Sequence, residues 1–71
     1  MSITEVPITG VIRLGQFLQA AGLIDSGADA KAVIADGLVQ VNDEVETRRG
    51  RQLHPGDVVS YGGHGARVTD G

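Results

Sequence analysis

Two short helical patterns, each followed by a glycine, constrain the fold of this chain more than any other feature. The first contains apolar residues at the spacing of a helix that buries one side, namely Leu14, Phe17, Leu18 and Ala21. Gly22 follows, where a helix commonly ends in the left-handed conformation. The second begins at Ser26, a good N-cap with Asp29 three residues later, and is followed by Gly37. Together they predict an αα-hairpin or a helix-turn-helix-like corner.

The second half of the chain contains short runs rich in β-branched residues, which predict strands joined by tight turns. The predicted strands are residues 38–41, 44–47, 58–61 and 66–69, with a flexible turn at residues 62–65. The pair Asn42-Asp43 favours a two-residue hairpin turn, because both residues tolerate positive φ. Pro55 and Gly56 stand at the central positions of a predicted type II turn.

The N-terminal segment, residues 3–11, is rich in β-branched residues and contains Pro7, which predicts an edge strand or an extended arm. With 71 residues, the chain has room for one domain. We therefore expect a single α+β domain. Its N-terminal strand or arm spans residues 1–12. Residues 13–71 then form a two-helix αα-hairpin motif packed on a small curled antiparallel β-sheet.

Composition excludes several functional classes. The chain has no cysteine, so disulfides and cysteine-based metal sites are impossible. The two histidines, His54 and His64, have no ligand partners at the spacing of a zinc site. No nucleophile stands near a candidate base, so we expect neither catalysis nor a cofactor. The sequence shows no signal peptide and no apolar run of membrane-spanning length, and we expect a cytoplasmic protein.

Three of the six basic residues fall within four positions, although the net charge of −3 opposes general attraction to nucleic acid. They are Arg48, Arg49 and Arg51. Arginine offers a planar fork of donors that matches phosphate oxygens, and it stacks on exposed bases. Gly50 between them allows a phosphate to approach the backbone closely. The alternative is a solvated turn in which these arginines pair with nearby carboxylates, namely Asp43, Glu44 and Glu46.

The order of these features resembles the S-four (alpha-L) RNA-binding domain family. The resemblance covers residues 13–59, roughly two-thirds of the chain, and has no gap through the two helices and the first hairpin strand. The residues that carry it are Arg13-Leu14, Leu18, Gly22, Ser26, Ala28, Ala30, Lys31, Gly37, Val39, Val41-Asn42 and Pro55-Gly56-Asp57. The run Glu46-Thr47-Arg48-Arg49-Gly50 is similar to small bacterial members that consist of this domain alone.

The resemblance implies a non-catalytic protein that binds structured RNA, such as ribosomal or transfer RNA, through the helix pair and the loop after the first hairpin. By position, the residues that would contact the RNA backbone are Arg13, Ser26, Lys31, Arg48, Arg49 and Arg51. That many phosphate contacts predict a log–log salt slope of roughly −3 to −5. The chain departs from the family at Gly15, where many members have an acidic residue, and at Gly27, where many have a basic one. The cation missing at position 27 lowers the expected affinity.

Structural alternatives stay open for three of these residues. Ser26 is a natural helix cap, and its hydroxyl cannot fill both roles freely. Lys31 has the pattern of an ordinary surface charge. Arg13 stands at the start of a helix, where a cation is unfavourable, but a salt bridge to Asp36 or Asp57 also explains it.

A second hypothesis for the whole protein is a protein–protein interaction module on the same fold, which the acidic balance favours. The two hypotheses differ in the expected surface. An uninterrupted basic patch supports RNA binding, whereas a patch divided by Asp29 and Glu46 favours the interaction module.

Overall fold

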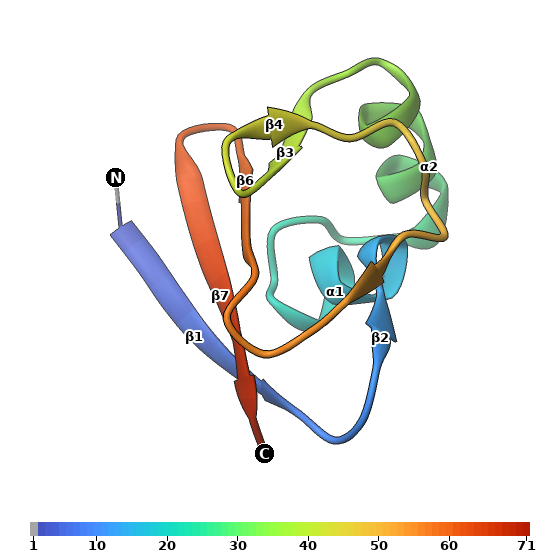
Figure 1. The fold of residues 1–71 in the computed structure, drawn as a ribbon. Helices are drawn as coiled ribbons and strands as arrows, with labels where there is room; N and C mark the ends of the chain where they lie inside the picture. The colour runs from blue at the N-terminus through green and yellow to red at the C-terminus, as the bar shows by residue number, and fades with distance from the viewer. Residues whose placement is uncertain (1) are drawn as a thin grey trace.

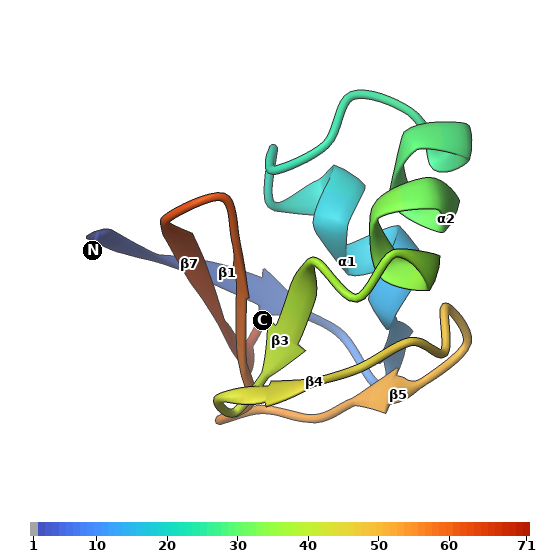
Figure 2. The same cartoon turned by 90° about the horizontal axis from the view of Figure 1, so that it is seen from above.

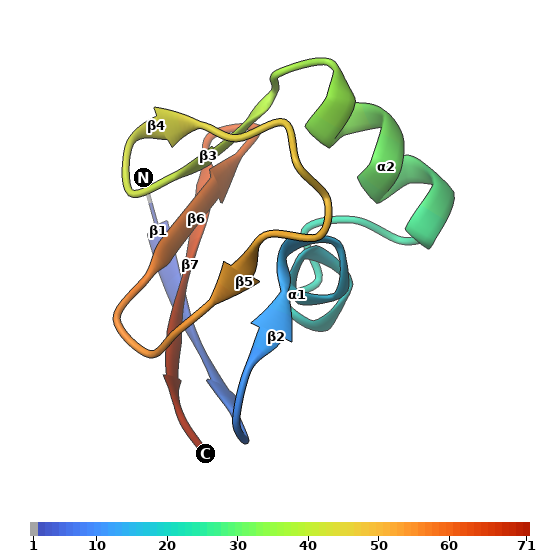
Figure 3. The same cartoon turned by 45° about the vertical axis from the view of Figure 1, so that its right-hand side comes forward.

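Both predicted helices are present in the computed structural model, which describes residues 2–71. They are α1, Leu14–Ala20, and α2, Gly27–Ala35. Gly22 and Gly37 have φ angles of 74° and 75°, the left-handed conformation that terminates a helix. Ser26 is the N-cap of α2, and its hydroxyl oxygen accepts a hydrogen bond from the Asp29 N–H at 3.2 Å. The predicted pair of short helices is confirmed, and Figure 3 shows α1 nearly end-on while α2 runs across the view, as in the predicted helix-turn-helix-like corner.

A five-stranded sheet with the order β1-β7-β6-β3-β4 carries both helices on one side (Figures 1 and 2). Its strands are β1, Ser2–Ile8; β3, Val39–Val41; β4, Glu44–Val45; β6, Val58–Tyr61; and β7, His64–Asp70. The predicted α+β class is confirmed. The sheet is mixed rather than antiparallel throughout, because β1 and β7 pair in parallel. The rest of the domain lies between these two strands in the chain and supplies the long crossover that a parallel pair requires.

The strand β1 lies at the edge of the sheet, as Pro7 predicts, since an edge strand tolerates a residue that cannot donate to the ladder. Met1, part of the predicted arm, is outside the described residues. Residues 58–61 match β6, whereas the other predicted strands differ in their bounds. β1 ends at Ile8 rather than at residue 11, and β3 begins at Val39 rather than at residue 38. β4 is shorter than residues 44–47, and β7 begins at His64, so the turn before it consists of Gly62 and Gly63 alone.

A second sheet, which no sequence pattern predicts, joins β2, Ile12–Arg13, to β5, Gln52–Leu53. The two strands are antiparallel, with Arg13 opposite Gln52. Two-residue strands are too short to show a period in the sequence. Figure 3 shows β5 and β2 side by side at the start of α1. The pairing brings residues from the two halves of the chain to the same end of α1.

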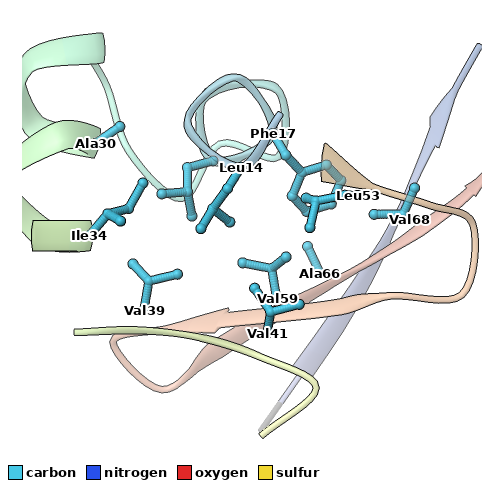
Figure 4. Packing of buried hydrophobic residues seen from close by; sticks show 11 residues of the cluster. Leu14, Phe17, Ala30, Ile34, Val39, Val41, Leu53, Val59, Ala66 and Val68 are labelled. Carbon is cyan, nitrogen blue, oxygen red and sulfur yellow. The ribbon is translucent and has the colours of Figure 1, made fainter. Parts of the chain in front are cut away.

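The hydrophobic core lies between the helices and the main sheet, where buried side chains of both layers point toward one another (Figure 4). It contains Leu14, Phe17, Leu18, Ala30, Ile34, Val39, Val41, Leu53, Val59, Ala66 and Val68. The predicted stripe of α1 is fully buried at three positions, and Ala21 is half-buried. Within residues 2–71, neither helix has the length and apolar character needed to cross a membrane.

Two turns are tied together by the side chains of Asn42 and Asp57. Asn42 and Asp43 have φ angles of 53° and 69°, so the predicted two-residue turn is confirmed. The side-chain Nδ2 of Asn42 donates to Asp57 Oδ1 at 3.1 Å, and the side-chain Oδ1 of Asn42 accepts from the Val58 N–H at 3.0 Å. The His54 N–H donates to the other Asp57 oxygen at 2.9 Å. Burial raises the pKa of Asp57, but these hydrogen bonds outweigh it and hold the pKa below its ordinary value.

Candidate nucleic-acid interface

The connection between β4 and β5, residues 46–51 and here named the arginine loop, lies against the first turn of α1 (Figure 3). The Leu14 N–H donates to the Arg51 carbonyl oxygen at 2.8 Å, and the Gly15 N–H donates to the Arg49 carbonyl oxygen at 3.1 Å. The first N–H groups of a helix have no partner within the helix. The arginine loop therefore satisfies two of them and is fixed in place by doing so.

Gly15 allows this close approach because it has no side chain. A Cβ built at this buried position would lie 2.7 Å from Cγ and 3.2 Å from Cδ of Arg49. Carbon atoms in favourable contact are about 3.5–4.0 Å apart. Any larger residue at position 15 would displace the Arg49 side chain. Glycine at position 15, where the family resemblance led us to expect an acidic residue, therefore allows the Arg49 side chain to lie directly against α1.

A groove of about 340 Å³ opens between the first turns of both helices and the arginine loop, and we name it the cationic groove. It is lined by two arginines, two glutamines and four small residues, namely Arg13, Arg49, Gln16, Gln19, Gly15, Gly27, Ala30 and Gly50. None of these eight lining residues is a carboxylate. The cationic groove is therefore locally positive in a chain whose net charge is −3.

Glu46 is the one buried charged side chain within residues 2–71, with 7% of its surface exposed. Its carboxylate accepts hydrogen bonds from the Arg48 N–H, Nε and Nη2 at 3.1, 3.2 and 3.2 Å, and from Arg51 Nη1 at 3.0 Å. The hydrogen bond from the Arg48 side chain is the largest cause that lowers the pKa of Glu46 from 4.5 to about 2. Glu46 is thus ionised at neutral pH, and its one negative charge offsets one of the two positive charges of these arginines.

The predicted alternative of arginine–carboxylate pairing is therefore correct in part. Arg48 and Arg51 form salt bridges with Glu46. Within the described chain, Asp43 and Glu44 form none. Glu46 follows β4 directly, its N–H still donates to the Val39 carbonyl oxygen of β3 at 3.0 Å, and its side chain is buried. We name Arg48, Arg49 and Arg51 the arginine cluster. Glu46 pairs with Arg48 and Arg51, whereas Arg49 lines the cationic groove.

The predicted RNA-contacting residues occupy three different settings. Arg13 and Arg49 lie together at the cationic groove, and neither forms a salt bridge within residues 2–71. Arg48 and Arg51 are bound to Glu46, although 77% of the Arg48 side chain remains exposed. Ser26 acts as the cap of α2, and Lys31 is exposed on α2 outside the groove lining.

Two glutamines of the cationic groove were missed by the sequence analysis. Gln16 and Gln19 lie three positions apart on α1, so they share a face of the helix next to its buried stripe. The side-chain oxygen of Gln16 accepts a hydrogen bond from the Arg13 N–H at 3.3 Å. The sequence contained a usable indication, since polar residues at i and i+3 on an otherwise apolar helix mark its outer face.

Metal binding has no candidate site in the part of the chain that the structure describes. No group of three or more His, Cys, Asp or Glu side chains there is arranged to hold a metal ion. The side chains that line the cationic groove include no carboxylate, imidazole or thiolate, and its two guanidinium groups repel a cation. Its chemistry suits the binding of an anion with hydrogen-bonding groups attached.

A family model for the S4 domain matches residues 7–69. The chain belongs to the S4 domain family. The matched range contains both helices, the arginine loop and the cationic groove, and it extends beyond the resemblance at residues 13–59. The predicted S-four family and its alpha-L fold are confirmed.

Relatives of this S4 domain protein are known in bacteria. It is 50% identical over 58 residues to the probable ribosome maturation protein RlbA of Bacillus subtilis (strain 168), which covers 82% of each chain. It is 40% identical over 58 residues to YbcJ of Escherichia coli (strain K12), covering 82% of this chain and 83% of YbcJ. The solution structure of YbcJ is described as revealing an alpha-L motif involved in RNA binding. It matches with a TM-score of 0.68 and 35% identity, covering 97% of this chain and 87% of YbcJ.

Proposed function

We propose that this S4 domain protein binds structured RNA, such as ribosomal or transfer RNA, and that it does so without catalysing a reaction. The observation that carries the proposal is the cationic groove, in which Arg13 and Arg49 face a cavity with no carboxylate among its eight lining residues. The description of YbcJ as RNA-binding and the name of RlbA support it. The proposed location is the cytoplasm.

The net charge of −3 does not oppose this proposal strongly. Net charge governs long-range attraction and solubility, whereas short-range phosphate binding depends on the local arrangement of cations. Exposed charges farther away than about 8 Å are largely screened at physiological salt. Carboxylates far from the groove therefore reduce the rate of encounter more than they weaken a bound phosphate, whereas Asp29, in the first turn of α2, lies next to the groove lining.

The predicted contact residues have unequal roles in the proposed complex. Arg13 and Arg49 hold phosphates at the cationic groove, and the exposed Lys31 adds charge one helical turn beyond Gly27. Arg48 and Arg51 mainly hold the arginine loop in shape through Glu46. Ser26 caps α2 and contributes to RNA binding only by keeping that helix start intact.

A titration of the purified protein into fluorescently labelled transfer RNA and a labelled ribosomal RNA fragment tests the proposal. We expect binding that weakens steeply as KCl is raised, because phosphate contacts release counterions. A duplex DNA of similar length serves as the comparison for unspecific attraction. No binding to either RNA at low salt would overturn the proposal.

A protein–protein interaction module is the second candidate function, and one observation favours it. Glu46 pairs with Arg48 and Arg51, two of the three clustered arginines, and its one negative charge offsets one of their two positive charges. Affinity capture from a bacterial lysate, with and without nuclease, separates the candidates. One protein partner retained after nuclease treatment, together with no bound RNA, would favour the interaction module.

A further inference from the structure

The shape of the cationic groove limits which part of an RNA enters it. The whole domain measures 29 × 24 × 21 Å, and the groove is a concave space of about 340 Å³ between two helix starts and a loop. A-form RNA presents a wide, shallow minor groove and a major groove that side chains cannot read. A paired stem can place only its phosphates and riboses in a concavity of this kind, because its bases stay stacked inside the helix, whereas a base turned out of its helix can enter as well.

Glycines keep the cationic groove open at its two ends. At Gly27, an added Cβ would have the Gln19 side-chain oxygen at 3.8 Å as its nearest neighbour. At Gly50, an added Cβ would lie 3.9 Å from Arg13 Nη1. Each of these positions has room for one carbon, but a longer side chain would extend into the groove. The open space therefore depends on the small residues that line it.

The cationic groove offers two kinds of polar group. The guanidinium groups come from Arg13 and Arg49, and the primary amides come from Gln16 and Gln19. The Gln16 side-chain oxygen already accepts a hydrogen bond from the Arg13 N–H at 3.3 Å. Within residues 2–71, no hydrogen bond occupies the Gln19 side chain. A primary amide offers both donors and an acceptor, which matches the mixed edge of a nucleobase. A guanidinium matches a phosphate or stacks on a base.

We infer that the cationic groove receives one unpaired nucleotide of a structured RNA, with its two flanking phosphates on Arg13 and Arg49 and its base edge on the Gln19 amide. This inference rests on the proposed function, since it requires that the protein binds RNA. It adds a class of RNA ligand, namely RNA with an extruded nucleotide. It also makes Gln19 a residue that distinguishes such RNA from fully paired RNA.

The test compares two labelled RNA hairpins, one fully paired and one carrying a single-nucleotide bulge in the same stem, at one salt concentration. The wild-type protein should bind the bulged hairpin at least about fivefold more tightly, the factor expected for one base-edge contact. Gln19→Ala should remove this preference, because it should weaken binding to the bulged hairpin more than binding to the paired one. Gln40→Ala is the matched control, because Gln40 is an exposed glutamine of β3 outside the groove lining.

A second pair of variants tests whether binding of the bulged hairpin requires the open volume of the cationic groove, independently of the Gln19 amide. Gly27→Ala should keep the preference, since its Cβ fits at 3.8 Å, whereas Gly27→Leu should remove it by filling the groove. Circular dichroism establishes that each variant is folded. Equal, salt-sensitive binding of both hairpins by the wild-type protein would overturn the inference and leave the proposed function standing. Absence of binding to both hairpins would overturn the proposed function as well.

Discussion

The side chain of Arg49 crosses α1 directly over Gly15, so closely that a Cβ at position 15 would lie 2.7 Å from Arg49 Cγ. The backbones of the two residues are also joined, because the Gly15 N–H donates to the Arg49 carbonyl oxygen at 3.1 Å. The start of α1 and the arginine loop therefore form one structural unit. Changes at position 15 are expected to act on the cationic groove through Arg49.

Gly15→Ala should lower both the free energy of unfolding and RNA affinity. Alanine improves helix propensity by about 0.5–1 kcal/mol, but overpacking against Arg49 costs about 1–3 kcal/mol, so the net effect is a loss. Urea unfolding and RNA titration measure the two effects. Gly27→Ala is the control, since its Cβ meets nothing closer than 3.8 Å and should be neutral or slightly stabilising. A more stable Gly15→Ala variant would show that Arg49 moves aside without cost.

Arg49→Ala should weaken RNA binding on the order of tenfold, because it removes a charge-assisted contact at the cationic groove. Arg48→Ala should weaken it less, since the guanidinium of Arg48 is engaged by Glu46. Comparison of the dissociation constants for one RNA at fixed salt measures the difference. If a folded Arg48→Ala variant bound RNA more weakly than Arg49→Ala does, the assignment of Arg49 to RNA contact and of Arg48 to loop structure would be wrong.

Glu46→Gln should reduce stability in a pH-dependent manner. The pKa of Glu46 is lowered from 4.5 to about 2 in the folded protein, so between these values the unfolded chain binds more protons than the folded one. The stability that Glu46 contributes is fully present above pH 4.5 and is lost as the pH falls toward about 2. Urea unfolding of both proteins across this range should show their stabilities converging at low pH. A difference that stays constant down to pH 2 would exclude this cause.

Ser26→Ala should lower the free energy of unfolding by about 1 kcal/mol, the usual effect of losing an N-cap hydrogen bond. The hydroxyl of Ser26 is already used by the Asp29 N–H, so RNA affinity should change little under conditions where the variant is folded. Thermal unfolding and RNA titration of the same preparation test both statements. A strong loss of affinity with unchanged stability would instead make Ser26 a direct RNA contact.

The helix pair was predictable because its determinants are local in the sequence. The apolar spacing of α1 and the glycines at positions 22 and 37 act within one or two turns of their own helix. The parallel pairing of β1 with β7 and the pairing of β2 with β5 were not predictable in this way. Both join segments that are far apart in the chain, and two-residue strands show no period.

The candidate site was predictable as a cluster of residues but not as an arrangement. The arginine cluster is visible in the sequence, yet three carboxylates stood equally near it. Only the fold shows that Glu46 is buried and forms salt bridges with Arg48 and Arg51, whereas Arg49 lines the cationic groove. Gln19 and Gly27 line the same groove although they lie on different helices, and this arrangement has no counterpart in the local pattern of either helix.

The central claim is that the cationic groove, rather than the whole arginine cluster, holds the RNA. Arg13, Lys31 and Arg49 form no salt bridge within residues 2–71, and three such cations predict a log–log salt slope of roughly −2 to −3. This slope is shallower than the value expected if every predicted cation contributes.

The most direct measurement is the salt dependence of RNA binding by the wild-type protein and by an Arg13→Ala/Arg49→Ala double variant. The double variant should bind much more weakly, and its slope should be shallower by roughly 1.5, the share of two phosphate contacts. An unchanged affinity and slope in a folded double variant would contradict the claim.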